Sequence, residues 1–217
     1  MCYNIGMLDY TDICFNIEKY QEMCREKGVT FTLATKTIPK ETLERLSERY
    51  DLIYGENRVQ ELVDKYFEGP RWIFIGRLQK NKVKYLVNRV EMICSVDSVN
   101  LAKEIQKRCV AKGKVMPVLI EINLGEEQKG GVSIEELPAL IQEIQASPNL
   151  DWQGLMAVLP IEGAPDAAAK AADVYQTLKK QYPIRYLSMG MSQDFELAIE
   201  AGGNMVRLGS AVFGRRS

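Results

Sequence analysis

The sequence predicts an α/β protein built as a TIM-type (β/α)8 barrel, in which parallel strands alternate with covering helices. The first observation is that strand-like runs and amphipathic stretches alternate along the chain, with turn residues between them. The second is that polar residues occupy the inward register of predicted strands. Glu121 and Asn123, for example, alternate with Ile120 and Ile122, whose side chains would face helices. A barrel mouth accounts for such inward polar residues.

The chain begins with an extra helix, predicted over residues 8–27. Eight strand-like runs follow, each bounded by turn residues. They cover 30–36, 51–56, 71–77, 91–97, 116–123, 151–159, 184–190 and 204–209. The stretches between them, such as 40–50 and 98–112, are amphipathic and are predicted to be the covering helices.

A doubly wound open sheet is the alternative fold, because the same alternation would suit it at this length. No G-x-G-x-x-G turn follows the first predicted strand, so nothing in the sequence favours that alternative. The chain also has no linker or low-complexity tract. We therefore expect one domain over residues 1–217.

Composition bounds the function. The chain has 217 residues, of which 46% are hydrophobic, and a formal net charge of -1, so it can bury a substantial core and is not a general polyanion binder. A nucleic-acid-binding module is disfavoured for the same reason. We interpret one basic stretch as a solvated helix face. It comprises Arg77, Lys80, Lys82, Lys84 and Arg89.

The sequence predicts a cytoplasmic protein without a membrane partner. Residues 1–9 lack a basic region followed by a long apolar core, and no later run approaches the ~20 apolar residues of a membrane span. The five cysteines form no C-x-x-C pair and read as reduced thiols. Histidine is absent, so any chemistry must come from lysine, tyrosine, cysteine, carboxylates or a cofactor.

Lys36 is the first candidate site residue. It ends the strand-like run 30–36, and the breaker Pro39 follows. Side chains alternate along a strand, so Lys36 lies on the same face as Thr32 and Ala34. If helices cover the opposite face, the ammonium group is directed inward at the carboxyl end of the strand, where barrel proteins place their sites.

The loops after the seventh and eighth strands are suited to a phosphate group. Barrels often bind phosphate there, and the site needs close backbone N–H groups together with hydroxyl donors. Gly190 and Ser192 follow the seventh strand, and Gly209 and Ser210 follow the eighth. These four residues offer that combination.

A phosphate site opposite an inward lysine predicts a phosphorylated aldehyde held as a Schiff base, with pyridoxal phosphate as the leading candidate. Arg207 shares its strand face with Met205 and Gly209, so it could reach the cofactor ring. An arginine beside the pyridine nitrogen would keep that nitrogen unprotonated and weaken general carbanion chemistry. After the second strand, Asn57 is the expected cofactor contact.

Several neighbouring residues have a purely structural interpretation. Glu56 and Arg58 are expected to cap and pair on the helix that follows them. Met189 and Met191 read as packing residues, and Cys94 reads as a core residue rather than a nucleophile.

Four sets of motifs together resemble the YggS/PROSC family of pyridoxal phosphate homeostasis proteins, which is similar to the barrel domain of bacterial alanine racemase standing alone. The motifs are ATKT at 34–37, YGENRVQEL at 54–62, FIGRLQKNK at 74–82, and LSMGMS at 187–192 followed by MVRLGSAVFG at 205–214. The resemblance covers nearly the whole chain and implies the same barrel fold.

The resemblance also implies roles for the candidate residues. Lys36 would be the Schiff-base lysine, and Arg207 would face the pyridine nitrogen. Ser192, Gly209 and Ser210 would hold the phosphate. The predicted cofactor-binding set is completed by Asn57, Ser188 and Met191.

Three positions depart from the family pattern. Arg77 and Cys94 stand where the family commonly has histidine, and Ser210 replaces a frequent threonine. The serine is a mild change, and attachment of the cofactor does not depend on the residue at position 77.

The resemblance implies a protein that binds and buffers pyridoxal phosphate and hands it to apo-enzymes, without established turnover. We expect a monomer. The alternative is an amino-acid racemase, which needs a second acid/base group opposite the lysine. In the racemase, that group is a tyrosine from a separate β-domain of the partner subunit, and we expect no such domain here. Tyr54, Tyr85 or Tyr186 could substitute, but nothing in the sequence places one opposite Lys36.

Overall fold

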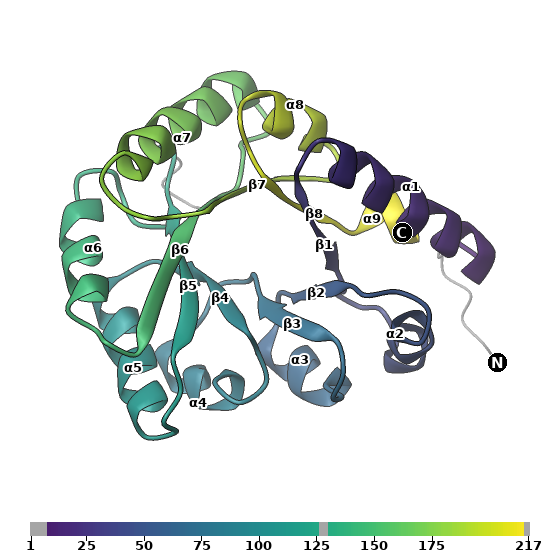
Figure 1. Cartoon of the computed structure of the whole chain (residues 1–217), viewed down its shortest axis with the longest axis horizontal. Helices are drawn as coiled ribbons and strands as arrows, with labels where there is room; N and C mark the ends of the chain where they lie inside the picture. The colour runs from purple at the N-terminus through teal and green to yellow at the C-terminus, as the bar shows by residue number, and fades with distance from the viewer. Residues whose placement is uncertain (1–7, 126–129, 215–217) are drawn as a thin grey trace.

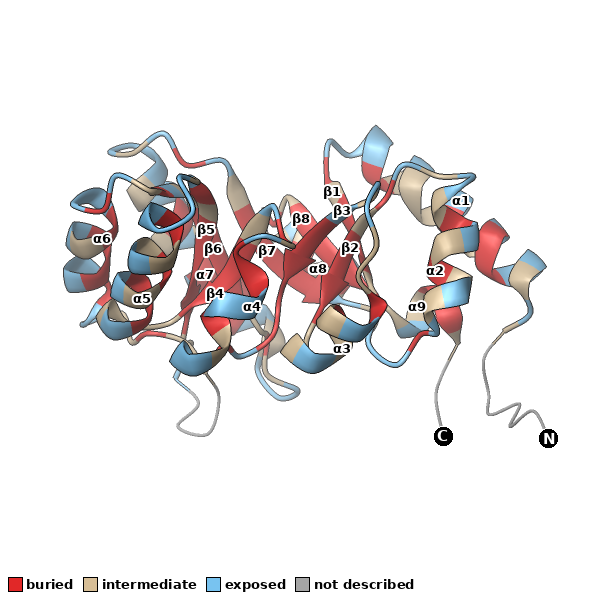
Figure 2. Ribbon diagram, turned by 90° about the horizontal axis from the view of Figure 1, so that it is seen from below, coloured by how far each residue is buried: buried red, intermediate tan, exposed pale blue. Residues whose placement is uncertain are grey.

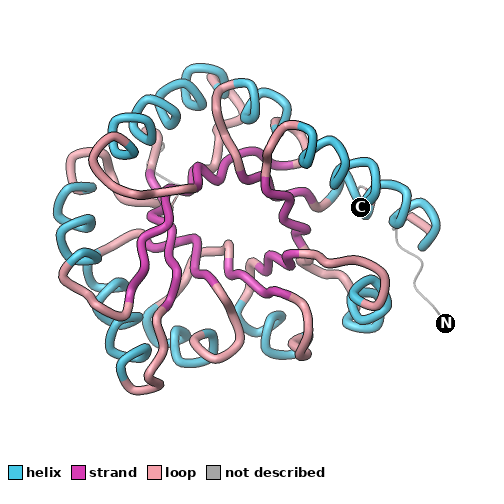
Figure 3. Tube along the Cα trace, viewed as in Figure 1, coloured by secondary structure: helices cyan, strands magenta, loops and turns pink. Residues whose placement is uncertain are grey.

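The protein is a closed barrel of parallel strands with helices on the outside, as the computed structural model shows for residues 8–125 and 130–214 (Figure 1). The strands are arranged in sequence order from β1 to β8, and β8 pairs with β1 to close the ring. The predicted TIM-type barrel is therefore confirmed. Figure 3 shows the strands as an inner ring surrounded by helices.

Each of the eight predicted strand runs overlaps one observed strand. They are β1 (Thr30–Ala34), β2 (Ile53–Glu56), β3 (Arg71–Phe74), β4 (Met92–Val96), β5 (Met116–Ile122), β6 (Leu150–Ala157), β7 (Tyr186–Met191) and β8 (Met205–Leu208). The helices are α1 (Tyr10–Glu26), α2 (Lys40–Ser47), α3 (Val59–Lys65), α4 (Val83–Leu86), α5 (Val99–Val110), α6 (Leu137–Gln145), α7 (Ala164–Lys179), α8 (Phe195–Glu200) and α9 (Ser210–Phe213), with a short 3-10 turn at Lys80–Lys82.

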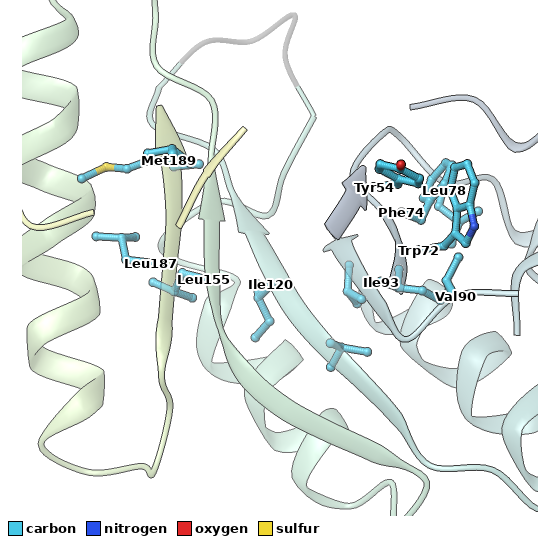
Figure 4. Close-up of a cluster of buried hydrophobic side chains, with 14 of the residues drawn as sticks. Tyr54, Trp72, Phe74, Leu78, Val90, Ile93, Ile120, Leu155, Leu187 and Met189 are labelled. Carbon is cyan, nitrogen blue, oxygen red and sulfur yellow. The ribbon is translucent and has the colours of Figure 1, made fainter. Parts of the chain in front are cut away.

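Alternation along the strands produces two apolar layers. Outward side chains pack under the helices, as the cluster around Tyr54, Trp72 and Phe74 shows (Figure 4). The Tyr54 and Trp72 rings meet edge to face, with centroids 5.1 Å apart, a favoured geometry for aromatic pairs. A smaller cluster that includes Leu119 and Met205 fills the barrel interior. Buried residues accordingly line the strands and the inner helix faces (Figure 2).

The register predicted for the fifth strand is confirmed. Val118, Ile120 and Ile122 belong to the outer layer beneath the helices. Leu119, between them, belongs to the interior cluster, and Glu121 is buried on the same inward side.

The first strand ends earlier than predicted, at Ala34 instead of Lys36. Thr35 still donates its N–H to the Gly55 carbonyl at 2.9 Å, but Ile38 N–H returns to the Thr35 carbonyl at 3.0 Å. Thr37 has a φ of 64°, in the left-handed region. The chain therefore turns here, and Lys36 lies in the turn after β1 rather than on the strand itself.

Helix α1 covers the junction between the first and last strands. Asp9 caps it by accepting a hydrogen bond from Asp12 N–H at 2.9 Å. Its neighbour in space is α9, from the other end of the chain (Figure 1). Leu8 N–H donates to the Phe213 carbonyl at 3.1 Å, and Asn16 Nδ2 donates to the Val212 carbonyl at 3.2 Å.

The basic stretch lies at the surface, with Arg77, Lys80 and Lys84 exposed, as expected for a solvated face. Four cysteines, Cys14, Cys24, Cys94 and Cys109, are buried free thiols. Cys2 and the rest of residues 1–7 lie outside the described residues. None of the helices in the described ranges combines the length and apolar character needed to cross a membrane.

Candidate cofactor site

A cavity of about 980 Å³ opens at the carboxyl ends of the strands. Its walls come from the ends of several strands and from the first helix. Seven predicted site residues line it, namely Lys36, Asn57, Met191, Ser192, Arg207, Gly209 and Ser210. Ser188 and Gly190 do not, and Gly190 instead packs against α8, where an added Cβ would lie 2.7 Å from Ala198 Cβ. Residues from opposite ends of the sequence therefore meet in one place, because β1 and β8 are neighbours.

Arg207 is fixed in the interior of the barrel. It pairs in register with Thr32 of β1, and its side chain is buried, with 5% of the residue exposed. Its Nη1 donates to the Ser188 carbonyl at 2.8 Å and to Ser188 Oγ at 2.7 Å, and its Nη2 donates to the Ala157 carbonyl at 3.0 Å. Ser188 thus lies behind Arg207, where it orients the guanidinium group instead of lining the cavity.

Burial shifts the pKa values of Arg207 and of its neighbour Glu121. Burial lowers the pKa of Arg207, whereas the neighbouring groups Cys94, Glu121 and Asp194 oppose that change. Burial also raises the pKa of the Glu121 carboxyl to about 7; Asp97 adds to this rise, and Arg207 and Arg77 oppose it. The inward position of Glu121 was predicted, but its titration near neutral pH was not.

Cys94 belongs to the barrel interior, as its interpretation as a core residue predicted. Burial raises the pKa of its thiol to about 12. A thiol that stays protonated at neutral pH is a poor nucleophile. Cys94 therefore packs the inside of the barrel below the cavity residues.

The loops after β7 and β8 are joined by the Ser192 side chain. Ser192 Oγ accepts hydrogen bonds from Gly209 N–H at 3.1 Å and Ala211 N–H at 3.0 Å. Two backbone N–H groups therefore converge on one oxygen atom, which is the arrangement that an oxygen of an anion also accepts. A side chain at Gly209 would crowd this loop, because an added Cβ would lie 3.3 Å from the Ala34 carbonyl oxygen.

Lys36 reaches the cavity from the turn after β1, and its side chain is exposed there. Asn57, at the end of β2, has its backbone fixed from two sides. Its N–H donates to Glu56 Oε1 at 2.7 Å. Gly76 packs so closely that an added Cβ would lie 1.9 Å from the Asn57 carbonyl oxygen. The Asn57 side chain therefore extends from a backbone that is fixed by a hydrogen bond and by close packing.

A buried charged cluster next to Lys36 was not predicted as a unit. It comprises Glu56, Glu61 and Lys65, and its two ion pairs are 3.0 Å and 2.8 Å long. Arg58 pairs with Glu61 on α3 at 3.4 Å, as expected, whereas Glu56 accepts from the N–H groups of Asn57 and Arg58, which precede the first residue of that helix. The i,i+4 spacing of Glu61 and Lys65 was a visible signal for one pair. Nothing in the sequence indicated that Lys65 reaches the backbone of Thr35, directly after β1.

The methionine interpretations have different outcomes. Met189 is fully buried in the outer layer, as expected for a packing residue. Met191 is 39% exposed and lines the cavity, so its interpretation as a packing residue is wrong. The reason is that β7 ends at Met191, where the chain leaves the sheet for the mouth of the barrel.

The tyrosines considered as a second acid/base group do not line the cavity. Tyr54 is buried under the helices and donates its hydroxyl to the Leu43 carbonyl at 2.9 Å. Tyr186 packs against the interior cluster, and Tyr85 is exposed on α4. Among the residues that the structure describes, the tyrosine that lines the cavity is Tyr20, from α1, which the sequence had not suggested.

The donor groups of the cavity suit a small anionic aldehyde. Converging N–H groups and hydroxyls lie at one part of its wall, a lysine at another, and a buried arginine cation at its inner end. Phosphate, aldehyde and ring nitrogen each have a chemically matched partner in this set. The residues present therefore fit a phosphorylated pyridine aldehyde.

The profile of the family described as "Alanine racemase, N-terminal domain" matches residues 15–217. A pyridoxal phosphate homeostasis protein of Aquifex aeolicus is 42% identical over 216 residues, covering 92% of this chain and 95% of the relative. This chain belongs to the pyridoxal phosphate homeostasis protein family. The resemblance inferred from the sequence motifs is thereby confirmed.

Other family members agree in length and fold. The homologue from Vibrio cholerae is 35% identical over 222 residues, covering 94% of this chain and 93% of that protein. The solved structure of PipY from Synechococcus elongatus, with pyridoxal phosphate bound, has a TM-score of 0.83 to this chain at 25% identity. The match covers 93% of this family member and 100% of PipY.

Proposed function

We propose that this protein binds pyridoxal 5'-phosphate as a Schiff base on Lys36 and acts in pyridoxal phosphate homeostasis. The observation that carries the proposal is that one cavity brings Lys36 together with Arg207 and with the linked loops of Ser192 and Gly209. Support comes from relatives named pyridoxal phosphate homeostasis proteins and from PipY, whose structure contains the cofactor.

Each residue has a distinct task in this proposal. Ser192 and Ser210 bind the phosphate through their hydroxyl groups, and Gly209 lets the phosphate approach the loop closely because it has no side chain. Asn57 contacts the cofactor from the end of β2. The bound cofactor supplies a reactive aldehyde, and Lys36 keeps that aldehyde covalently attached and therefore sequestered.

Arg207 favours storage over catalysis. Its guanidinium group is held by Ser188 and Ala157, and a fixed cation beside the ring nitrogen opposes protonation of that nitrogen. An unprotonated ring withdraws electrons less strongly, which weakens general carbanion chemistry. Ser188 contributes by orienting Arg207, and Met191 forms part of the wall.

In this proposal residues 1–217 work as one domain in the cytoplasm. The protein acts as a monomer that keeps free aldehyde low and passes the cofactor to pyridoxal-phosphate-dependent apo-enzymes. Turnover is not required, because delivery needs only reversible attachment at Lys36.

The experiment is the visible absorption spectrum of the purified protein with added pyridoxal phosphate, followed by borohydride reduction and peptide mass mapping. A reduced pyridoxyl group on Lys36 is the expected result. Lys36→Ala should abolish the adduct and leave the fold intact, because an exposed side chain contributes little to packing. Lys19→Ala is the matched control, since Lys19 also lines the cavity.

The control variant should retain the full adduct on Lys36. A borohydride-stable adduct at full stoichiometry in Lys36→Ala would refute the assignment. The same preparations, incubated with L-alanine, should leave its optical activity unchanged. A loss of optical activity proportional to protein concentration would instead favour a racemase.

A further inference from the structure

Lys65 of α3 is buried beside the turn that carries Lys36. Only 9% of Lys65 is exposed to solvent. Its Nζ donates hydrogen bonds to Thr35 O at 3.0 Å, to Glu56 Oε2 at 3.0 Å and to Glu61 Oε2 at 2.8 Å. An ammonium group has three N–H donors, so these three acceptors satisfy all of them. One of the three is the backbone of the residue directly before Lys36.

Glu56 holds the same residue through its side chain. Thr35 Oγ1 lies 3.0 Å from Glu56 Oε2, to which it donates, and Glu56 is fully buried. The other carboxylate oxygen of Glu56 accepts from Asn57 N–H at 2.7 Å. Glu56 therefore connects the side chain of Thr35, the residue before Lys36, with the backbone of Asn57.

Glu61 holds the residue after Lys36. Thr37 N–H donates to Glu61 Oε2 at 2.7 Å, and the same oxygen accepts from Lys65. Thr37 adopts a φ of 64°, which a threonine rarely adopts without such a restraint. Burial would raise the pKa of Glu61, but the hydrogen bonds from Lys65 and Thr37 outweigh it, so the pKa is lowered and the carboxylate stays charged.

We propose that Lys65 is a positioning residue for Lys36: through Glu56 and Glu61 it fixes the backbone on both sides of the reactive amine. The inference rests on the proposed function of Lys36. Attachment forms a C=N bond between Lys36 Nζ and the aldehyde carbon, and the aldehyde oxygen leaves as water with the two hydrogens of the neutral amine. The rate of this step depends on how accurately the amine is placed.

Lys65 does not react with the aldehyde itself. Its three donors are used by protein acceptors, and it is absent from the described lining of the cavity. Its contribution is geometric and should appear in attachment rather than in non-covalent binding. The hydrogen bonds that link the loops after β7 and β8 share no partner with Lys65.

The test uses Lys65→Met in the full-length protein, with Lys103→Met as the matched control. Lys103 pairs with Glu143 at 3.6 Å on the surface, so its variant also removes one lysine ion pair. Glu61→Ala is the second variant, because this partly exposed position removes the acceptor of Thr37 and Lys65 with less risk to folding. Circular dichroism and thermal unfolding establish that each variant is folded.

Three quantities are measured for each protein. The first is the rate at which pyridoxal phosphate forms a borohydride-fixable adduct on Lys36. The second is the affinity for pyridoxine 5'-phosphate, which keeps the phosphate and ring but has no aldehyde. The third is backbone amide exchange of residues 35–40 in the cofactor-free protein.

We expect Lys65→Met, or Glu61→Ala if the first variant does not fold, to slow attachment at least about tenfold, since misplacement by about 1 Å can cost about 10²-fold. Affinity for pyridoxine 5'-phosphate should stay within about twofold, and exchange at 35–40 should accelerate. Unchanged attachment would overturn the inference, as would a parallel loss of attachment and analogue affinity. If wild-type protein forms no Lys36 adduct, the proposed function itself fails.

Discussion

The hydroxyl oxygen of Ser192, directly after β7, accepts a 3.1 Å hydrogen bond from the backbone N–H of Gly209, directly after β8. The same oxygen accepts from Ala211 N–H at 3.0 Å. One side chain therefore joins the two loops that barrels commonly use for phosphate. The spacing of those loops depends on this side chain.

Ser192→Ala should weaken binding of pyridoxal phosphate by about tenfold, which corresponds to about 1.4 kcal/mol. The two N–H groups lose their common acceptor, so the free energy of unfolding should also fall by about 1 kcal/mol. Titration calorimetry and urea unfolding measure the two effects. Ser133→Ala is the control, because Ser133 Oγ accepts from Glu136 N–H at 3.2 Å far from the cavity. Equal affinities for the two variants would contradict the prediction.

Substituting valine for Thr32, on β1, and for Thr35, directly after β1, should change the free energy of unfolding in opposite directions. Thr32 Oγ1 is buried and has no hydrogen-bond partner among the residues that the structure describes. Thr35 Oγ1, also buried, donates to Glu56 Oε2. Thr32→Val should raise the free energy of unfolding by about 1 kcal/mol, and Thr35→Val should lower it by about 2 kcal/mol. Urea unfolding of both variants measures this, and a destabilised Thr32→Val would refute it.

The stability of the cofactor-free protein should depend on Glu121. Burial raises the pKa of its carboxyl from 4.5 to about 7 in the folded protein. Stability from the protonated carboxyl is therefore fully present below about pH 4.5 and is lost as the pH rises through about 7. The full loss is about 3 kcal/mol. Urea unfolding between pH 5 and 8 should show this slope in wild-type protein.

Glu121→Gln provides the comparison, because glutamine has a similar shape and does not titrate. The difference in unfolding free energy between wild type and Glu121→Gln should shift in favour of the variant as the pH rises. Parallel pH profiles for the two proteins would mean that Glu121 does not titrate in this range.

Arg207→Gln should destabilise the protein by about 2 kcal/mol or more, because it removes donors from the buried carbonyls of Ser188 and Ala157. It also removes a charge that opposes the raised pKa of Glu121, so the pH dependence of stability should move to higher pH. Arg108→Gln is the control, since its 2.6 Å pair with Glu104 is at the surface and should contribute about 0–1 kcal/mol. Similar losses for both variants would contradict the role of Arg207.

The barrel could be predicted because its signals are local. Strand-like and amphipathic stretches alternate, and alternation within a strand correctly placed Glu121 inside and Val118 outside. Strand ends were less predictable, since they depend on contacts from elsewhere. The predicted strand 71–77 ends at Phe74, and the first strand stops where Glu61 of α3 binds Thr37.

The candidate site was predictable to the same extent. Lys36, Arg207 and the two glycine-serine loops lie at strand ends, and the barrel brings strand ends together. Lys65 and Tyr20 were missed because each reaches the site from a helix. The way a helix packs against the barrel depends on tertiary contacts and cannot be read from its local sequence. A helix surface position becomes part of a site only through tertiary packing.

The pairing of β1 with β8 has a consequence for how the protein is made. Lys36 is translated before Arg207, Gly209 and Ser210, its neighbours across the β1–β8 pairing. If the proposed function holds, a nascent chain that ends before β8 has the amine but not the phosphate loops, so it cannot hold the aldehyde until the ring of strands has closed. Ligand that binds only the closed ring also stabilises it by mass action. The supply of pyridoxal phosphate would thus change the yield of folded protein as well as the fraction of protein that carries the cofactor.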